Sequence, residues 1–268
     1  MYHIWSSNPN YLEPKSSDWV KERNKTHKTY LEECEKVELF KNYNWVLSYK
    51  TKEILDLPNI NFLELLKSRK TVRNFNWWII NFNLLFSVLH YSLYTVRKTR
   101  EMISNYNEDI NNLKKSEYSA LEFYLVIFNV EWLEKWVYHF NLKNLSLDLI
   151  KKWDFRENVK DIQMWQAVLD DAKYSIYITA DYSKWMWRYR YSHKLRLLLI
   201  QVWKIAQQIV NISLAFDIWT FMSPAIKDSK AEELLWLDWY KEWVVYFMCF
   251  WKYQKDNSES DRFNNLPV

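Results

Sequence analysis

Apolar residues gather in several long segments of this chain. The segment 77–94 contains no charged residue apart from His90, and it is long enough to cross a hydrocarbon core about 30 Å thick. Aromatic residues stand at both of its ends, as they do at membrane interfaces. Asn81, Asn83 and His90 inside the segment argue against a span. The pattern therefore predicts either a transmembrane helix or a buried core helix.

The other apolar segments carry more charge. Residues 119–140 are interrupted by three glutamates and a lysine, which predicts a core or interfacial helix. Residues 145–172 alternate charge with apolar side chains at helical spacing, and residues 195–225 and 234–253 are two further long apolar segments. Residues 174–179 alone are rich in strand-forming side chains, and we do not expect them to build a sheet.

The chain contains no glycine, and this decides the predicted fold class. Left-handed helix caps and tight hairpin turns prefer glycine, and asparagine replaces it only at a cost. Long helices need few such turns, whereas sandwiches and barrels need many. We therefore predict an all-α fold: an irregular multi-helix bundle with one to three membrane-spanning or interfacial helices. The bundle is one helical unit over residues 1–268, with extended arms at 1–17 and 254–268.

Composition bears on the origin of the chain. Glycine makes up about 7% of ordinary proteins, whereas this chain has none, together with 17 tryptophans and only 5 prolines. Strong AT pressure removes glycine and proline codons, and it enriches tryptophan where UGA encodes that residue. In composition the chain resembles the rapidly diverging proteins encoded in AT-rich mitochondrial genomes of the ciliate type. A glycine-free designed sequence is the alternative.

The chemistry that the sequence excludes is clear. Without glycine there is no phosphate-binding loop, dinucleotide fingerprint or nucleophile elbow. The five histidines are widely separated, and Cys34 and Cys249 stand alone, so neither residue type forms a set with metal-ligand spacing. We therefore predict no catalytic residues, no cofactor and no metal.

One local segment, residues 184–196, interleaves cations with aromatic rings. Three uses fit this mixture: binding of anionic lipid such as cardiolipin, stacking on single-stranded RNA, or packing of the rings while the cations reach water. The segment directly precedes an apolar run, which favours lipid over RNA. The candidate lipid- or phosphate-binding residues are Trp185, Trp187, Arg188, Arg190, Lys194 and Arg196.

The resemblance in composition implies a subunit of a large mitochondrial assembly. We predict a non-catalytic accessory subunit, not an enzyme, of a respiratory complex or ATP synthase at the mitochondrial inner membrane. It would pack against the other subunits of that complex and against cardiolipin. The alternative is a mitoribosomal protein that binds rRNA through residues 184–196, although a net charge of +4 is low for an RNA-coating protein.

Overall fold

A seven-stranded antiparallel sheet forms the centre of the protein in the computed structural model. The structure describes residues 38–68, 79–104, 118–166, 169–189 and 194–252. The strand order is β1-β6-β5-β3-β7-β9-β8, and every neighbouring pair is antiparallel. The strands of this sheet are β1 (Ser48–Tyr49), β3 (Leu121–Ile127), β5 (Val137–Asn141), β6 (Ser146–Lys151), β7 (Tyr174–Asp181), β8 (Ile218–Ser223) and β9 (Glu242–Lys252). Two short strands, β2 (Ile80–Asn81) and β4 (Val130–Glu131), pair in parallel beside it.

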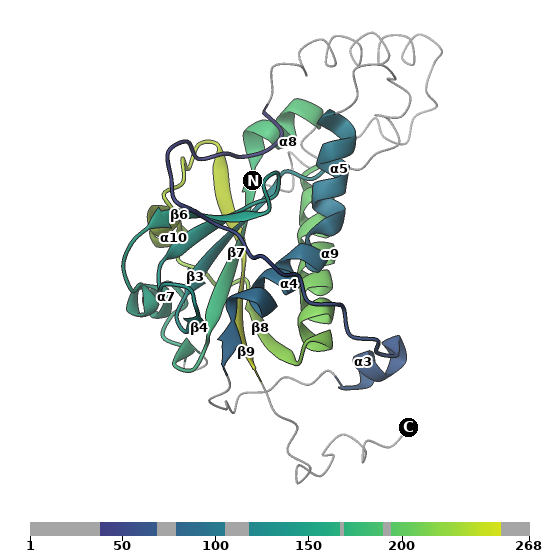
Figure 1. The fold of residues 1–268 in the computed structure, drawn as a ribbon. Helices are drawn as coiled ribbons and strands as arrows, with labels where there is room; N and C mark the ends of the chain where they lie inside the picture. The colour runs from purple at the N-terminus through teal and green to yellow at the C-terminus, as the bar shows by residue number, and fades with distance from the viewer. Residues whose placement is uncertain (1–37, 69–78, 105–117, 167–168, 190–193, 253–268) are drawn as a thin grey trace, which may run out of the picture.

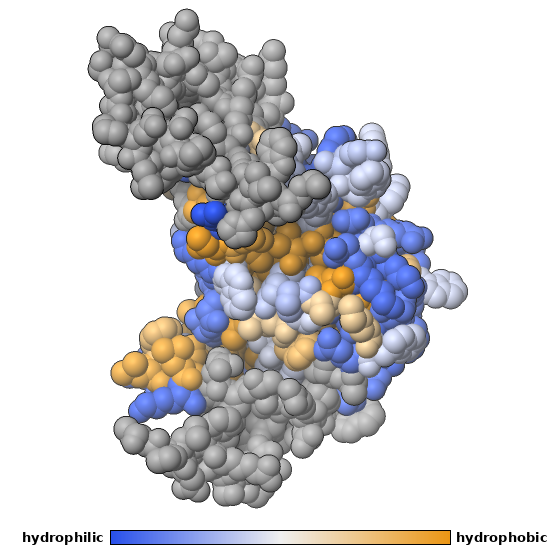
Figure 2. Space-filling view, turned by 180° about the vertical axis from the view of Figure 1, so that it is seen from behind, coloured by the Kyte–Doolittle hydropathy of each residue, from blue (hydrophilic) through white to orange (hydrophobic). Residues whose placement is uncertain are grey.

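Helices cover both faces of the sheet (Figure 1). The buried side chains of α4 and α5 and most of those of α9 belong to the apolar core on one face, and those of α7 and α10 belong to the core on the other. The helices are α3 (Phe62–Ser68), α4 (Phe82–Ser92), α5 (Tyr94–Ser104), α7 (Arg156–Ile162), α8 (Tyr182–Arg188), α9 (Leu195–Ala215) and α10 (Asp228–Leu235). Apolar side chains of α3 are exposed, and they stand out at the lower left of Figure 2.

The central strands are buried on both sides. Leu121 and Phe123 of β3 face one core, while Tyr124 and Val126 face the other. All the residues of β3 and β7 are buried. A strand covered on both faces has no alternation of apolar and polar residues, so its sequence looks like that of a buried helix.

The predicted all-α bundle is wrong, because the fold rests on this sheet. Residues 174–179, from which we expected no sheet, lie in β7, which is an inner strand of the sheet. The helix that we expected at 119–140 is instead the strands β3, β4 and β5. Apolar segment 195–225 divides into α9 and β8, and segment 234–253 holds the end of α10 and β9. The two apolar cores lie on opposite faces of this sheet, and a bundle made only of helices has no such sheet between its cores.

The argument from missing glycine fails because other residues adopt the left-handed conformation. Seven described residues have φ between 49° and 66°: Trp45, Trp132, Leu145, Met164, Trp165, Asp217 and Trp236. This conformation costs roughly 1–2 kcal/mol for each residue with a Cβ atom. Trp236 caps α10 in this way, with its N–H donating to the carbonyls of Glu232 and Glu233. Glycine is therefore preferred at such sites, but the fold does not require it.

The turn between β5 and β6 shows a second substitute for glycine. The side-chain oxygen of Asn141 accepts the backbone N–H groups of Lys143 and Asn144, both at 3.0 Å. This arrangement supplies the hydrogen bonds of a tight turn from a side chain. Leu145 then completes the turn with φ 49°.

The transmembrane interpretation of residues 77–94 is also wrong. Its described part forms α4, which begins at the side-chain cap of Asn81 and is largely buried against the sheet. Among the described residues, α9 alone is long and apolar enough to cross a membrane, and half of it is buried in the protein. The predicted arms at 1–17 and 254–268 lie outside the described residues, and the single unit over 1–268 stays a prediction.

Candidate functional site

Charged side chains meet in the interior at one end of the sheet, where β3 begins and β7 ends. Glu122 of β3 is fully buried and is the centre of this cluster. One of its oxygens accepts from Arg100 Nη1 at 2.9 Å and from Lys184 Nζ at 3.3 Å. The other lies 3.0 Å from His139 Nε2. Residues from α5, β3, β5 and α8 therefore converge on one carboxylate.

Neighbouring side chains stabilise the negative charge of Glu122. Burial alone would raise the pKa of this carboxyl, but the Arg100 guanidinium, and after it Lys184 and His139, hold the pKa well below its usual range. Arg100 is itself fully buried, and it also donates to the backbone carbonyls of Ser119 and Leu121. A buried charge is tolerated when it is paired and hydrogen-bonded in this way.

A second buried carboxylate, Glu242 at the start of β9, continues the cluster. Its two oxygens accept from Lys41 Nζ and from the hydroxyl of Thr179. Lys41 Nζ also donates to the hydroxyl of Tyr124 at 2.6 Å, and this hydroxyl lies 2.9 Å from that of Tyr43. The four side chains are hydrogen-bonded in the order Glu242, Lys41, Tyr124 and Tyr43, and this row is called the proton chain.

Every group of the proton chain that shows a shifted pKa keeps its proton. Burial would lower the pKa of Lys41, but Glu242, together with Tyr43 and Glu122, outweighs burial and raises the pKa. Burial raises the pKa of Tyr43 and raises that of Tyr124 well above the usual value, where Glu242 adds to the effect. The ammonium therefore stays charged, and both phenols stay neutral near pH 7.

The proton chain reaches the surface at its Tyr43 end. Lys41 and Tyr43 are half-buried, whereas Tyr124 is fully buried. Because Lys41 donates to Tyr124, the hydrogen of Tyr124 can point to Tyr43, and the hydrogen of Tyr43 can then point outward. In this order the hydrogen of the half-buried Tyr43 phenol is left free to bond to a molecule at the surface.

Aromatic residues lie on the chain beside this end of the sheet. Trp239, Tyr240 and Trp243 are exposed and precede or flank Glu242. Ring centroids are 3.7 Å apart for Trp239 and Tyr240, and 4.2 Å apart for Trp243 and Tyr182 of α8. Exposed aromatic faces of this kind can stack on a planar molecule.

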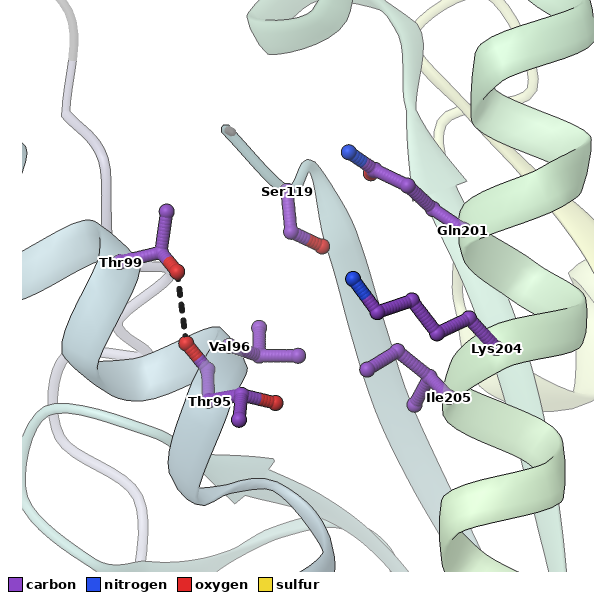
Figure 3. Close-up of a pocket in the computed structure, with 7 residues that line it drawn as sticks. All are labelled: Thr95, Val96, Thr99, Ser119, Gln201, Lys204 and Ile205. Atoms are coloured by element: carbon purple, nitrogen blue, oxygen red, sulfur yellow. Dashed lines mark hydrogen bonds between the residues drawn. The ribbon is translucent and has the colours of Figure 1, made fainter. Parts of the chain in front are cut away.

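A pocket lies on the other side of the start of β3, between α5 and α9 (Figure 3). Its volume is about 80 Å³. Ser119, whose carbonyl accepts from Arg100, forms part of its wall. The lining residues are Thr95, Val96, Thr99, Ser119, Gln201, Lys204 and Ile205.

Among the predicted lipid- or phosphate-binding residues, the structure describes the side chains of Trp185, Lys194 and Arg196. Trp185 is buried in the core and packs against the ring of Tyr189, 4.3 Å between centroids. Trp187 and Arg188 follow in α8, and Arg190 lies outside the described residues. Lys194 caps α9, and Arg196 is exposed in its first turn. Lipid or RNA binding by residues 184–196, and the subunit and cardiolipin partners, stay predictions.

Sequence reasoning missed the charged cluster. Glu122 and His139 were visible only as single polar residues in an apolar segment, and their pairing depends on adjacent strands β3 and β5. Lys184 opens the segment 184–196, in which cations alternate with aromatic rings, and this local pattern does not indicate its contact with the buried Glu122. The usable signal was the presence of charged residues inside segments too apolar to be exposed, because such charges need partners. Among the described residues, no three His, Cys, Asp or Glu side chains are grouped to hold a metal ion.

Comparison with known proteins identifies the fold. No family model and no curated protein matches the sequence. A putative nitroreductase from Ralstonia eutropha matches in structure with a TM-score of 0.59 at 10% identity, over 81% of this chain and 99% of that chain. A putative nitroreductase from Anabaena variabilis matches with a TM-score of 0.59 at 18% identity, over 81% of this chain and 44% of that chain. This chain therefore spans less than half the length of the Anabaena protein.

A third match is a chain of the E. coli microcin synthetase complex McbBCD with truncated pro-MccB17 bound. Its TM-score is 0.53 at 12% identity, over 90% of this chain and 95% of that chain. The fold of this protein is thus the nitroreductase fold.

These findings overturn the predicted function. The expected non-catalytic subunit of a respiratory complex or ATP synthase, and the mitoribosomal alternative, are both wrong, because the similar structures are nitroreductase-fold proteins. The prediction that the chain is not an enzyme is contradicted by the same likeness. Location at the mitochondrial inner membrane is contradicted as well, since the similar proteins are bacterial and α9 packs against the sheet.

Proposed function

We propose that this protein is an oxidoreductase that reduces a planar acceptor of the nitro-compound class. The observation that carries the proposal is the fold, which is shared over nearly the whole length of the putative nitroreductase from Ralstonia eutropha. The buried charged cluster and the exposed aromatic residues beside it support the proposal from this chain's own residues. Clusters of groups with strongly shifted pKa values are common at functional sites.

The proton chain supplies one of the two hydrogens that such a reduction consumes, and a hydride from the nicotinamide brings the other together with both electrons. Conversion of a nitro group to a nitroso group takes up two electrons and two protons and releases one water molecule. Tyr43 is the proton donor in this proposal, because its phenol keeps its hydrogen and is half-buried at the end of the chain. Lys41, which Glu242 holds in the charged form, donates to the hydroxyl of Tyr124 and so orients the Tyr124 hydrogen toward Tyr43, and water at the surface returns the proton to Tyr43.

The electrons must come from a reductant such as NADH or NADPH, because the side chains of the proton chain supply none. A redox cofactor does not fit the pocket between α5 and α9. That pocket measures about 80 Å³, whereas ligand pockets for larger molecules measure roughly 300–1,000 Å³.

Anaerobic turnover tests the proposal. The purified full chain is mixed with NADH or NADPH and a nitrobenzene derivative, with and without added flavin, and nicotinamide oxidation and the reduced product are both followed. We expect protein-dependent oxidation of one nicotinamide for each two-electron reduction of the nitro group. Folded protein, verified by circular dichroism, that gives no turnover above reductant and flavin alone would overturn the proposal.

A further inference from the structure

Four tryptophans have a backbone conformation that favours glycine. Of the seven described residues with positive φ, four are Trp45, Trp132, Trp165 and Trp236. A bulky side chain in this region is an outlier, and asparagine and aspartate are the usual substitutes for glycine there. Asparagine is plentiful in this chain, yet Asp217 is the one residue of that kind among the seven. Tryptophan therefore stands where the backbone favours glycine.

The rings of these four tryptophans lie largely in water. Their exposed fractions run from 62% to 103%, whereas tryptophan is highly buried on average. The left-handed conformation costs roughly 1–2 kcal/mol for a residue with a Cβ atom, and a ring in water gains little burial to offset this cost. The four side chains therefore destabilise the fold at the positions where they stand.

Two of the four tryptophans end a helix as a glycine does. The N–H of Trp165 donates to the carbonyl of Lys160 in the last turn of α7 at 2.7 Å. The N–H of Trp236 donates to the carbonyls of Glu232 and Glu233 in the last turn of α10. A left-handed residue that closes a helix in this way is usually glycine. Both positions use the backbone N–H, which glycine supplies equally well.

The number of tryptophans agrees with the number expected for glycine. The chain has 17 tryptophans and no glycine in 268 residues. This is a share of about 6%, and glycine makes up about 7% of ordinary proteins. The codons UGA and UGG differ from the glycine codons GGA and GGG in the first base alone. A glycine tRNA with one altered anticodon base would therefore read UGA.

We propose that the natural protein carries glycine at its tryptophan positions, because its gene writes glycine as UGA and its cell decodes UGA as glycine. The missing glycine, the excess of tryptophan and the four strained positions then have one cause. The proton chain contains no tryptophan and is unchanged. The rings of Trp239 and Trp243 are replaced, so the reductase proposal then rests on the fold and the proton chain without them.

Mass spectrometry of the protein isolated from its own cells tests the proposal. The intact mass should lie below the 33.2 kDa of the tryptophan-containing chain by 17 replacements of tryptophan with glycine. Digestion peptides that span residues 45, 132, 165 and 236 should each carry glycine. The control is the same chain produced with UGG codons in a host that reads them as tryptophan, which should have the full mass. Tryptophan at any of the four positions in the natural protein would overturn the proposal.

A stability comparison tests the structural part of the proposal. One variant carries glycine at the four left-handed positions, and the control variant combines Trp153→Gly with Trp239→Gly, at exposed residues with ordinary φ. In urea unfolding, the first variant should raise the folding equilibrium constant by about 30-fold or more, because relief of strain exceeds the backbone entropy of glycine. The control should give no gain, and no gain from the four-glycine variant would overturn the proposal. Neither experiment measures electron transfer, so failure here leaves the reductase proposal standing.

Discussion

Replacement of Glu122 by glutamine removes the negative charge on which the buried cluster depends. Arg100, Lys184 and His139 all contact this carboxylate, and Arg100 is fully buried. Removal of one partner from a buried ion pair leaves an uncompensated charge, which costs about 3–5 kcal/mol. Because small domains are stable by only about 5–15 kcal/mol, we expect Glu122→Gln to lose a large part of the total stability.

Urea unfolding followed by tryptophan fluorescence measures this loss. Glu131→Gln is the matched control, since Glu131 is exposed on β4 and its replacement should change stability by no more than about 0.5 kcal/mol. The double variant Arg100→Met with Glu122→Gln should lose less than the sum of the two single changes, because the charges compensate each other. A loss below about 1 kcal/mol for Glu122→Gln would refute the reasoning.

The same variant has a predicted pH dependence. The pKa of Glu122 in the folded protein lies below its usual value, so this group stabilises the fold above the unfolded pKa, about 4.3. That stabilisation is lost as the pH falls below this value toward the folded pKa. The stability difference between wild type and Glu122→Gln should therefore be constant near neutral pH and shrink in acid. A difference that grows in acid would contradict the assignment of charge.

Two further predictions concern backbone strain and the buried thiol. Trp236→Gly should raise stability by about 0.5–1 kcal/mol in urea unfolding, because Trp236 is 69% exposed and caps α10 with φ 57°. The control is Trp153→Gly, at an exposed residue with ordinary φ, which should give no gain. Equal gains for the two variants would show that backbone strain is not the cause. Burial raises the pKa of the Cys249 thiol. In a Cys34→Ser variant, a thiol reagent should therefore react with Cys249 only as fast as the protein unfolds. Rapid reaction of the native protein would contradict this burial.

The sequence allowed some of the structure to be predicted and hid the rest for physical reasons. The apolar segment 77–94 predicted either a transmembrane helix or a buried core helix, and its residues 82–92 form the largely buried helix α4. Strands β3 and β7 could not, because burial on both faces removes the period of two by which strands are recognised. The missing glycine misled the prediction, since its turns are replaced by residues such as Trp236 in the left-handed conformation.

The candidate site was harder to predict than the fold. Glu122 and Glu242 are 120 positions apart, and only the pairing of β3 with β7 and of β7 with β9 brings them to the same end of the sheet. Lys41 comes from a third part of the chain and completes the cluster through Glu242. Contacts between distant segments leave no mark in local spacing, whereas the exclusion of glycine-built phosphate sites follows directly from composition.

The kinetics of Tyr43→Phe test the central claim most directly. The variant keeps the ring that packs against His139 and removes only the hydroxyl at the end of the proton chain. In anaerobic reduction of a nitrobenzene derivative by NADH or NADPH, we predict that kcat falls about 100-fold or more while KM changes little. Tyr49→Phe, whose ring packs against Tyr138, should retain wild-type kcat. Turnover by Tyr43→Phe at the wild-type rate, or no turnover by the wild type itself, would contradict the account.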